Sequence, residues 1–218
     1  MKKEIPMGRV LVYFLGLVSY ACGACLATKA ALGLTPVTSI SYVLSLATEY
    51  SLGTVMLLYN VVLLLVERLL YGKAFQRRQY LQLPLSVFFS MLIDLCMYFF
   101  RHLDGVALPH RCLFFLAAMA LMGLGIAGTV CGALISLPAE GVVQAAAFCF
   151  GLEFSRTKLG HDCVVVALTV GLSLLLLGRL EGIQVGTLLS ALLLGPISRL
   201  WMNAIHAWVG LTPDVQRK

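Results

Sequence analysis

Charged residues are scarce in this chain of 218 residues: 12% are Asp, Glu, Lys or Arg, whereas 60% are hydrophobic. A soluble domain usually has about 25% charged residues, which cover its surface. The 16 basic and 10 acidic residues here are too few to cover a folded domain of this size. The composition excludes an ordinary soluble domain and predicts an all-α, polytopic membrane helix bundle that forms one integral membrane domain over residues 1–218.

Motifs of the common enzyme classes are also missing. The sequence has no Walker, HExxH or GxSxG pattern, so we expect neither enzymatic activity nor a catalytic residue nor a cofactor. The four histidines lack the spacing of a metal site, and we expect no bound metal. The seven cysteines are odd in number and lie in or beside apolar segments, which excludes a disulfide framework.

The excess of positive charge, +6 in total, does not predict nucleic-acid binding. The sequence has no basic stripe with interleaved aromatic residues, which is the usual footprint of a nucleic-acid surface. Basic residues in the cytoplasmic loops of a membrane protein account for the excess. We therefore expect no nucleic-acid partner.

Six apolar segments are long enough to cross a bilayer, which takes about 20 helical residues. They are residues 10–31, 52–70, 80–100, 112–135, 160–178 and 184–207. Two further segments, residues 36–48 and 138–151, are short and relatively polar. Each begins with proline, a favourable first residue of a helix, so we expect two short intramembrane helices.

The order long, short, long, long occurs twice along the chain. Gly-Leu-Thr-Pro at 33–36 opens the first short segment and Ser-Leu-Pro at 136–138 opens the second. The two halves lie about 105 residues apart, and internal duplication of this kind is common in transporters. We predict a first structural repeat over residues 10–105 and a second over residues 112–207.

The distribution of basic residues favours six crossings over eight. If the short helices are re-entrant, the repeats are inverted and the cytoplasmic side receives 11 Lys and Arg against 4 on the other side. If the short helices cross fully, the division is 9 to 6. The positive-inside rule therefore favours the inverted arrangement, with both termini in the cytoplasm and an uncleaved first span.

Polar residues at membrane depth are the candidate substrate-binding residues, because burying them is costly unless they are paired or hydrated. Asp94 lies in the middle of a long segment, and Asp162 follows Lys158 by four residues, where an interfacial ion pair is an equal alternative. A half-helix start favours a carboxylate such as Glu140, although a purely structural helix-end role stays open. The remaining candidates lie in the first turns of the short helices: Thr35, Pro36, Thr38, Ser39, Pro138 and Gln144.

Non-helical backbone before each short helix cannot face lipid, because each unsatisfied amide there costs several kcal/mol. It must be buried in protein or face water. Since the two breaks occupy equivalent places in the two halves, we expect both short helices to meet near the membrane midplane and line one polar cavity. Glu140 would be its only charged residue.

Several stretches are shared with a known family of small bacterial membrane proteins. They are residues 31–36 (ALGLTP), 137–144 (LPAEGVVQ), 178–183 (GRLEGI), Lys158 with Asp162, Gly186 with Thr187, and Gly195 with Pro196. On these stretches the chain resembles the YczE/YitT-type integral membrane proteins. The resemblance implies a multi-pass protein of the bacterial cytoplasmic membrane and names no substrate.

The duplicated architecture makes a small-solute transporter or permease the leading functional hypothesis. The alternative is a non-transporting accessory or regulatory membrane protein that acts through helix contacts with a partner. An intramembrane enzyme ranks below both, because no nucleophile–base or metal constellation is visible in the sequence. The expected partners are the lipid bilayer and an unidentified small solute, and a homo-oligomer or a partner membrane protein stays open.

Overall fold

The computed structural model describes residues 7–105 and 107–209, which contain eight α-helices and no strand. Three short 3-10 turns lie beside α3 and α4. The helices are α1 (Met7–Ala30), α2 (Pro36–Ala47), α3 (Leu52–Tyr71), α4 (Gln82–Phe99), α5 (Leu108–Gly132), α6 (Pro138–Phe150), α7 (Phe154–Leu177) and α8 (Val185–Val209). The predicted all-α membrane helix bundle is confirmed, with six long apolar helices and two short helices.

Local signals set most helix ends where the sequence places them. Pro36 and Pro138 occupy the first turns of α2 and α6, and the Ser51 side chain accepts the backbone N–H of Thr54 at the start of α3. Two predicted starts were wrong. The first turn of α5 includes Pro109, so the helix begins at Leu108 and not at 112.

The second wrong start is that of α7, which begins at Phe154 and not at 160. Its first two turns contain charged residues that the hydropathy pattern assigned to a loop. Lys158 and Asp162 lie one turn apart and form an ion pair along the helix, and Arg156 lies near Glu153. Such pairs at i, i+3 and i, i+4 spacing stabilise helical structure, so the charges do not end the helix.

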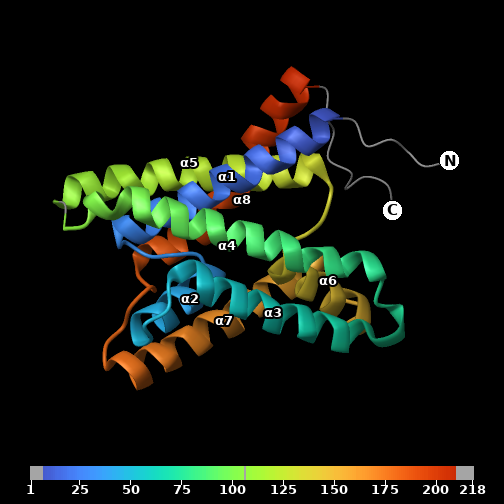
Figure 1. Cartoon of the computed structure of the whole chain (residues 1–218), viewed down its shortest axis with the longest axis horizontal. Coiled ribbons are helices and arrows are strands. Elements are labelled where there is room, and N and C mark those ends of the chain that lie inside the picture. The colour runs from blue at the N-terminus through green and yellow to red at the C-terminus, as the bar shows by residue number, and fades with distance from the viewer. Residues whose placement is uncertain (1–6, 106, 210–218) are drawn as a thin grey trace.

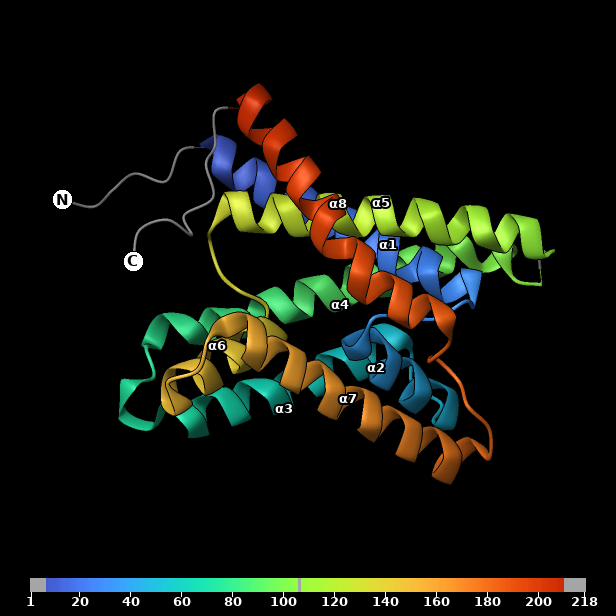
Figure 2. The same ribbon diagram turned by 180° about the vertical axis from the view of Figure 1, so that it is seen from behind.

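The helices form two layers joined by α4 (Figures 1 and 2). One layer contains α1, α5 and α8, and the other contains α2, α3, α6 and α7. α1 and α5 run antiparallel and make the most extensive helix pair, while α4 packs on both α1 and α3. The short helices lie at opposite ends of their layer, α2 on the left of Figure 1 and α6 on the right.

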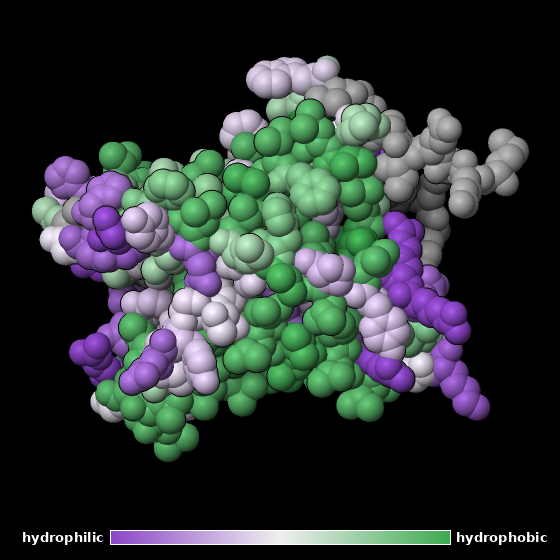
Figure 3. Space-filling model, in the orientation of Figure 1, coloured by the Kyte–Doolittle hydropathy of each residue, from purple (hydrophilic) through white to green (hydrophobic). Residues whose placement is uncertain are grey.

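On the face shown in Figure 3, an apolar band lies between two hydrophilic ends. Leucine, valine and phenylalanine side chains are exposed along the long helices, as in Leu65, Leu116 and Leu175. Lipid is the natural solvent for such a surface. The chain is therefore a multi-pass membrane protein. The first turn of α1 and the last described turn of α8 lie at the same end, which accords with an even number of crossings (Figure 2).

Each helix of the first half has a counterpart that begins 101 to 103 residues later: α1 and α5, α2 and α6, α3 and α7, α4 and α8. Ala31 and Ala133, at the ends of the first pair, share a left-handed backbone with φ of 48° and 49°. The packing also corresponds, since α2 packs on α7 as α3 packs on α6. The packing of the last two helices differs between the halves. In the first half α3 and α4 pack along each other, whereas in the second half α7 and α8 diverge (Figure 2). The duplication of residues 10–105 and 112–207 stays a prediction.

Small residues bring α1 and α5 into backbone contact. A Cβ on Gly23 would lie 2.8 Å from the backbone nitrogen of Met122, and a Cβ on Gly125 would lie 2.6 Å from that of Tyr20. Membrane helices have no hydrophobic drive toward each other, so close packing over small residues is what holds such a pair together. This pair forms the rigid centre against which the other helices are placed.

Candidate functional site

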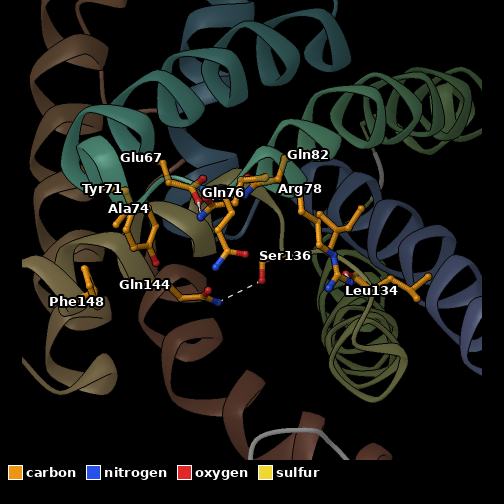
Figure 4. A pocket seen from close by; sticks show the side chains of 12 residues that line it. Glu67, Tyr71, Ala74, Gln76, Arg78, Gln82, Leu134, Ser136, Gln144 and Phe148 are labelled. Carbon is orange, nitrogen blue, oxygen red and sulfur yellow. Dashed lines mark hydrogen bonds between the residues drawn. The ribbon is translucent and has the colours of Figure 1, made fainter. Parts of the chain in front are cut away.

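A cavity of about 400 Å³ opens at the start of α6, between α3, α6 and the turn that joins α3 to α4 (Figure 4). The turn supplies three of its polar lining residues, Gln76, Arg78 and Gln79. The other lining residues are Glu67 and Tyr71 of α3, Ala74, Gln82 of α4, Leu134, Ile135, Ser136, and Gln144 and Phe148 of α6. Polar groups thus converge on a hollow with a few apolar walls, which is the usual make-up of a small-ligand site.

Glu67 is the buried acid of this cavity, with 1% of its surface exposed. Its Oε1 accepts hydrogen bonds from the side-chain amides of Gln79, at 2.7 Å, and Gln82, at 3.2 Å. Its Oε2 points at the first turn of α6, where a Cβ on Gly141 would lie only 2.4 Å away. Glycine at 141 therefore lets the carboxylate approach the N-terminal end of α6, whose dipole favours negative charge.

The connection between α5 and α6 forms the floor of the cavity. Its carbonyls are satisfied by side chains: Arg78 donates to the oxygen of Leu134 and Tyr13 donates to that of Ile135, both at 2.6 Å. Gln144 donates to the Ser136 hydroxyl at 3.2 Å (Figure 4). Non-helical backbone at membrane depth is tolerated where protein groups or a cavity satisfy it, and here both do.

The equivalent break before α2 is closed by backbone. Leu34 donates its N–H to Gly182 at 3.0 Å, and Gly186 donates its N–H to Leu32 at 2.7 Å. The predicted site residue Ser39 is fully buried and also donates to the Gly182 carbonyl, at 3.1 Å. The segment before α2 is thus sealed against the loop between α7 and α8.

The remaining predicted residues of the first half belong to this sealed region. The hydroxyls of Thr35 and Thr38 lie 2.9 Å apart and hydrogen-bond to each other. Thr38 is 2% exposed, and Pro36 occupies the first helical position without a backbone N–H. These residues start and fix α2, and the cavity at α6 does not include them.

Glu140 is half-buried in the first turn of α6 and lies outside the cavity lining. Of the second-half candidates, Pro138 begins α6, and Gln144 alone lines the cavity. One cavity lined jointly by both short helices stays a prediction.

The structure gives Asp94 and Asp162 specific partners. Asp94 accepts the backbone N–H of Gly53 at 2.8 Å and the Ser51 hydroxyl at 2.7 Å, so it binds the N-terminus of α3. Asp162 pairs with Lys158 and contacts Nδ1 of His161 at 3.2 Å. Both carboxylates therefore stabilise helix ends or helix surfaces in this conformation.

Sequence reasoning missed Glu67, Gln79 and Gln82. Glu67 precedes Arg68 near the end of an apolar run, where a charge is the ordinary mark of a span leaving the membrane. The next span contains a pattern that could have predicted a polar helix face here. Its polar residues recur every four positions and so share one face: Gln82, Ser86, Ser90 and Asp94.

Comparison with known proteins gives one match. Residues 7–203 match a family of unknown function, DUF6198. The match covers most of the chain, which therefore belongs to this family. The family description does not connect it with the YczE/YitT type. No curated protein and no solved structure matches the chain significantly.

Proposed function

We propose that this member of the DUF6198 family is a permease that moves a small polar solute across the bacterial cytoplasmic membrane. The observation that supports the proposal is the polar cavity of about 400 Å³ at the start of a short, proline-initiated helix within a multi-pass bundle. Interrupted helices commonly form the substrate sites of secondary transporters. The volume suits a metabolite-sized ligand.

The relation between the two halves supports alternating access. We infer two inverted repeats for two reasons. Corresponding helices begin 101 to 103 residues apart, and the corresponding helices α1 and α5 run in opposite directions (Figure 1). Two repeats of opposite orientation can exchange conformations about a shared centre. In this structure the break before α2 is sealed and the break before α6 opens into the cavity, as alternating access requires of one of its two end states.

The cavity chemistry favours a solute with hydrogen-bonding groups. Its lining combines amides of Gln76, Gln79 and Gln144, the Ser136 hydroxyl and the Arg78 guanidinium. Amides both donate and accept, so they suit amino-acid-like or other multiply hydrogen-bonding metabolites. The apolar side chains of Phe148 and Ile135 provide the remaining walls.

The test is uptake by the purified full chain in proteoliposomes, screened against a panel of radiolabelled metabolites with and without a proton gradient. Time-dependent accumulation of one compound by the protein alone supports the proposal. Absence of uptake for every compound, by protein that is folded and inserted, contradicts it.

Variants of the cavity then locate the site. Gln144→Leu removes one amide from the lining, and loss of one hydrogen bond of about 1 kcal/mol should weaken solute binding roughly fivefold. Thr157→Ala is the control, because Thr157 is half-buried at the start of α7, outside the cavity, and its hydroxyl donates only to the carbonyl of Glu153. Equal uptake constants for both variants would place the solute elsewhere.

A second function is favoured by the divergence of α7 and α8. Only about a fifth of each of these spans is buried, 17% and 22%, against 56% for α1. A partner membrane protein or a second copy of the chain seated there would make the protein an accessory subunit. Co-purification of one stoichiometric membrane partner, together with the absence of autonomous uptake, would support this function over transport.

A further inference from the structure

Unpartnered polar atoms are concentrated at one place between α3 and α4. Within the described part of the chain, Glu67 Oε2, Gln82 Oε1 and Ser86 Oγ are fully buried and have no hydrogen-bond partner. Each such atom costs about 1–3 kcal/mol. Native proteins keep few such atoms. Three of them in one helix interface indicate a site that binds a proton or another small ligand.

These atoms belong to a continuous polar face. On α4, Gln82, Ser86, Ser90 and Asp94 follow one another every four residues, and the first three are 3%, 1% and 6% exposed. On α3, Glu67 contacts Gln82 at one end and Gly53 contacts Asp94 at the other. Buried Asn60 lies midway between Gly53 and Glu67 along α3.

Glu67 has no counter-charge in this interface. The titratable and charged side chains on the elements packed around it are Tyr59, Arg68 and Tyr71 of α3, Lys73, Arg77, Arg78 and Tyr80 of the turn, Asp94, Cys96 and Tyr98 of α4, and Glu140 and Cys149 of α6. Arg68 donates to the Tyr80 hydroxyl, Arg78 donates to Leu134, and Cys149 donates to the carbonyl of Leu70. No described cation pairs with the carboxylate, so its ionised form is held by two amide donors and the start of α6 alone.

A proton on Glu67 gives the cluster the hydrogen-bond donor that it lacks. With Glu67 ionised, Oε2 and Gln82 Oε1 are both acceptors without a donor. Protonation converts the Glu67 carboxylate into a neutral acid with one O–H donor, and removes the cost of an unpaired buried charge.

Packing alone does not demand an acid at this position. In the other half, the residue 102 positions later is Thr169, which is fully buried and donates to the Val165 carbonyl at 2.7 Å. A neutral, self-satisfied side chain thus fills the corresponding place in α7. Of these two corresponding positions, only residue 67, which lines the cavity, carries a carboxyl group.

We propose that Glu67 is a proton-binding site: its carboxylate takes up one proton from the cavity and holds it as the neutral acid, with Oε1 still bonded to the amides of Gln79 and Gln82. No bond other than O–H forms or breaks. Proton binding at Glu67 couples the transport proposed above to a proton gradient. This role rests on the proposed transport function, although proton binding itself requires no solute.

The test is pH-difference infrared spectroscopy on the full chain in liposomes. Wild-type protein should show the carbonyl stretch of a protonated carboxylic acid that disappears as the pH rises. Glu67→Gln should lose this band, whereas the matched control Glu153→Gln, which removes an exposed carboxylate, should keep it. Superimposable spectra of wild type and Glu67→Gln over the whole pH range would overturn the proposal.

Two further variants complete the test. Gln82→Leu should shift the frequency of the Glu67 band, because one amide donor to Glu67 Oε1 is lost, whereas Gln184→Leu, at an exposed glutamine just before α8, should not. An unshifted band in Gln82→Leu would overturn the assignment of the band to Glu67. Should Glu67→Gln fail to fold, Glu67→Asp keeps the acid but moves it, so an unchanged band there would overturn the assignment.

The two proposals can fail separately. A titrating Glu67 band in a protein that takes up no solute would refute transport and leave the proton site standing. Solute uptake that is identical in wild type and Glu67→Gln and lacks a titrating Glu67 band would refute the proton site and leave transport standing.

Discussion

Gly16 of α1 and Gly128 of α5 meet backbone to backbone: a Cβ on Gly16 would lie 2.9 Å from the Gly128 carbonyl carbon. Neither helix can approach the other this closely over a larger residue. Because α1 and α5 form the most extensive helix pair, the spacing at this contact decides how the remaining helices seat on them.

Gly16→Ala or Gly128→Ala should therefore destabilise the protein. The added methyl groups meet backbone that cannot rotate away, and overpacking of this kind costs about 1–3 kcal/mol. The control is Gly171→Ala on α7, where no atom lies within 4 Å of the added Cβ and higher helix propensity should be neutral or slightly stabilising. Thermal unfolding in detergent measures all three; equal melting temperatures would refute the close contact.

Cys22 and Cys96 should form a disulfide under mild oxidation. Their sulfur atoms lie 3.3 Å apart, and closing to the bond length of about 2.05 Å needs only a small shift of either side chain. The measurement is the loss of two alkylatable thiols in a variant that keeps only these two cysteines. A variant that keeps only Cys22 and Cys131 should retain both thiols, and equal behaviour of the two would contradict the packing of α4 on α1.

Asp94→Ala should lower stability by about 0.5–2 kcal/mol, since it removes the acceptor of the Gly53 N–H and Ser51 hydroxyl at the start of α3. Asp94→Asn keeps one acceptor oxygen and should cost less. Glu153→Ala is the comparison, because its exposed ion pair with Arg156 should contribute little. If Asp94→Ala melts like wild type but abolishes uptake, the residue is functional and not a helix cap.

The inverted topology predicts which loops are labelled from outside intact cells. In a cysteine-free background, a membrane-impermeant maleimide should modify Asp104→Cys and spare Gln76→Cys, because the two exposed residues lie at opposite ends of α4. Permeabilised cells should show both sites labelled, which controls for reactivity. Labelling of Gln76→Cys alone would reverse the orientation.

The candidate site was only partly readable from the sequence. Gln144 was reached because a proline-initiated short helix is a local signal, written in consecutive residues. Glu67 was not, because its neighbour Arg68 and its place near the end of a span give it the pattern of an ordinary interfacial charge. Its burial depends on Gly141, 74 residues away, and on the amides of Gln79 and Gln82.

The sequence by itself determined the membrane class, the number of long helices, the two proline-initiated short helices and the spacing between the halves. These follow from hydropathy over stretches of about 20 residues and from backbone preferences of proline, which act locally. Only the tertiary structure decided which half-helix break is sealed and which opens into a cavity. That choice depends on how far each helix is rotated and how closely it packs, and such distances are set jointly by residues far apart in the chain.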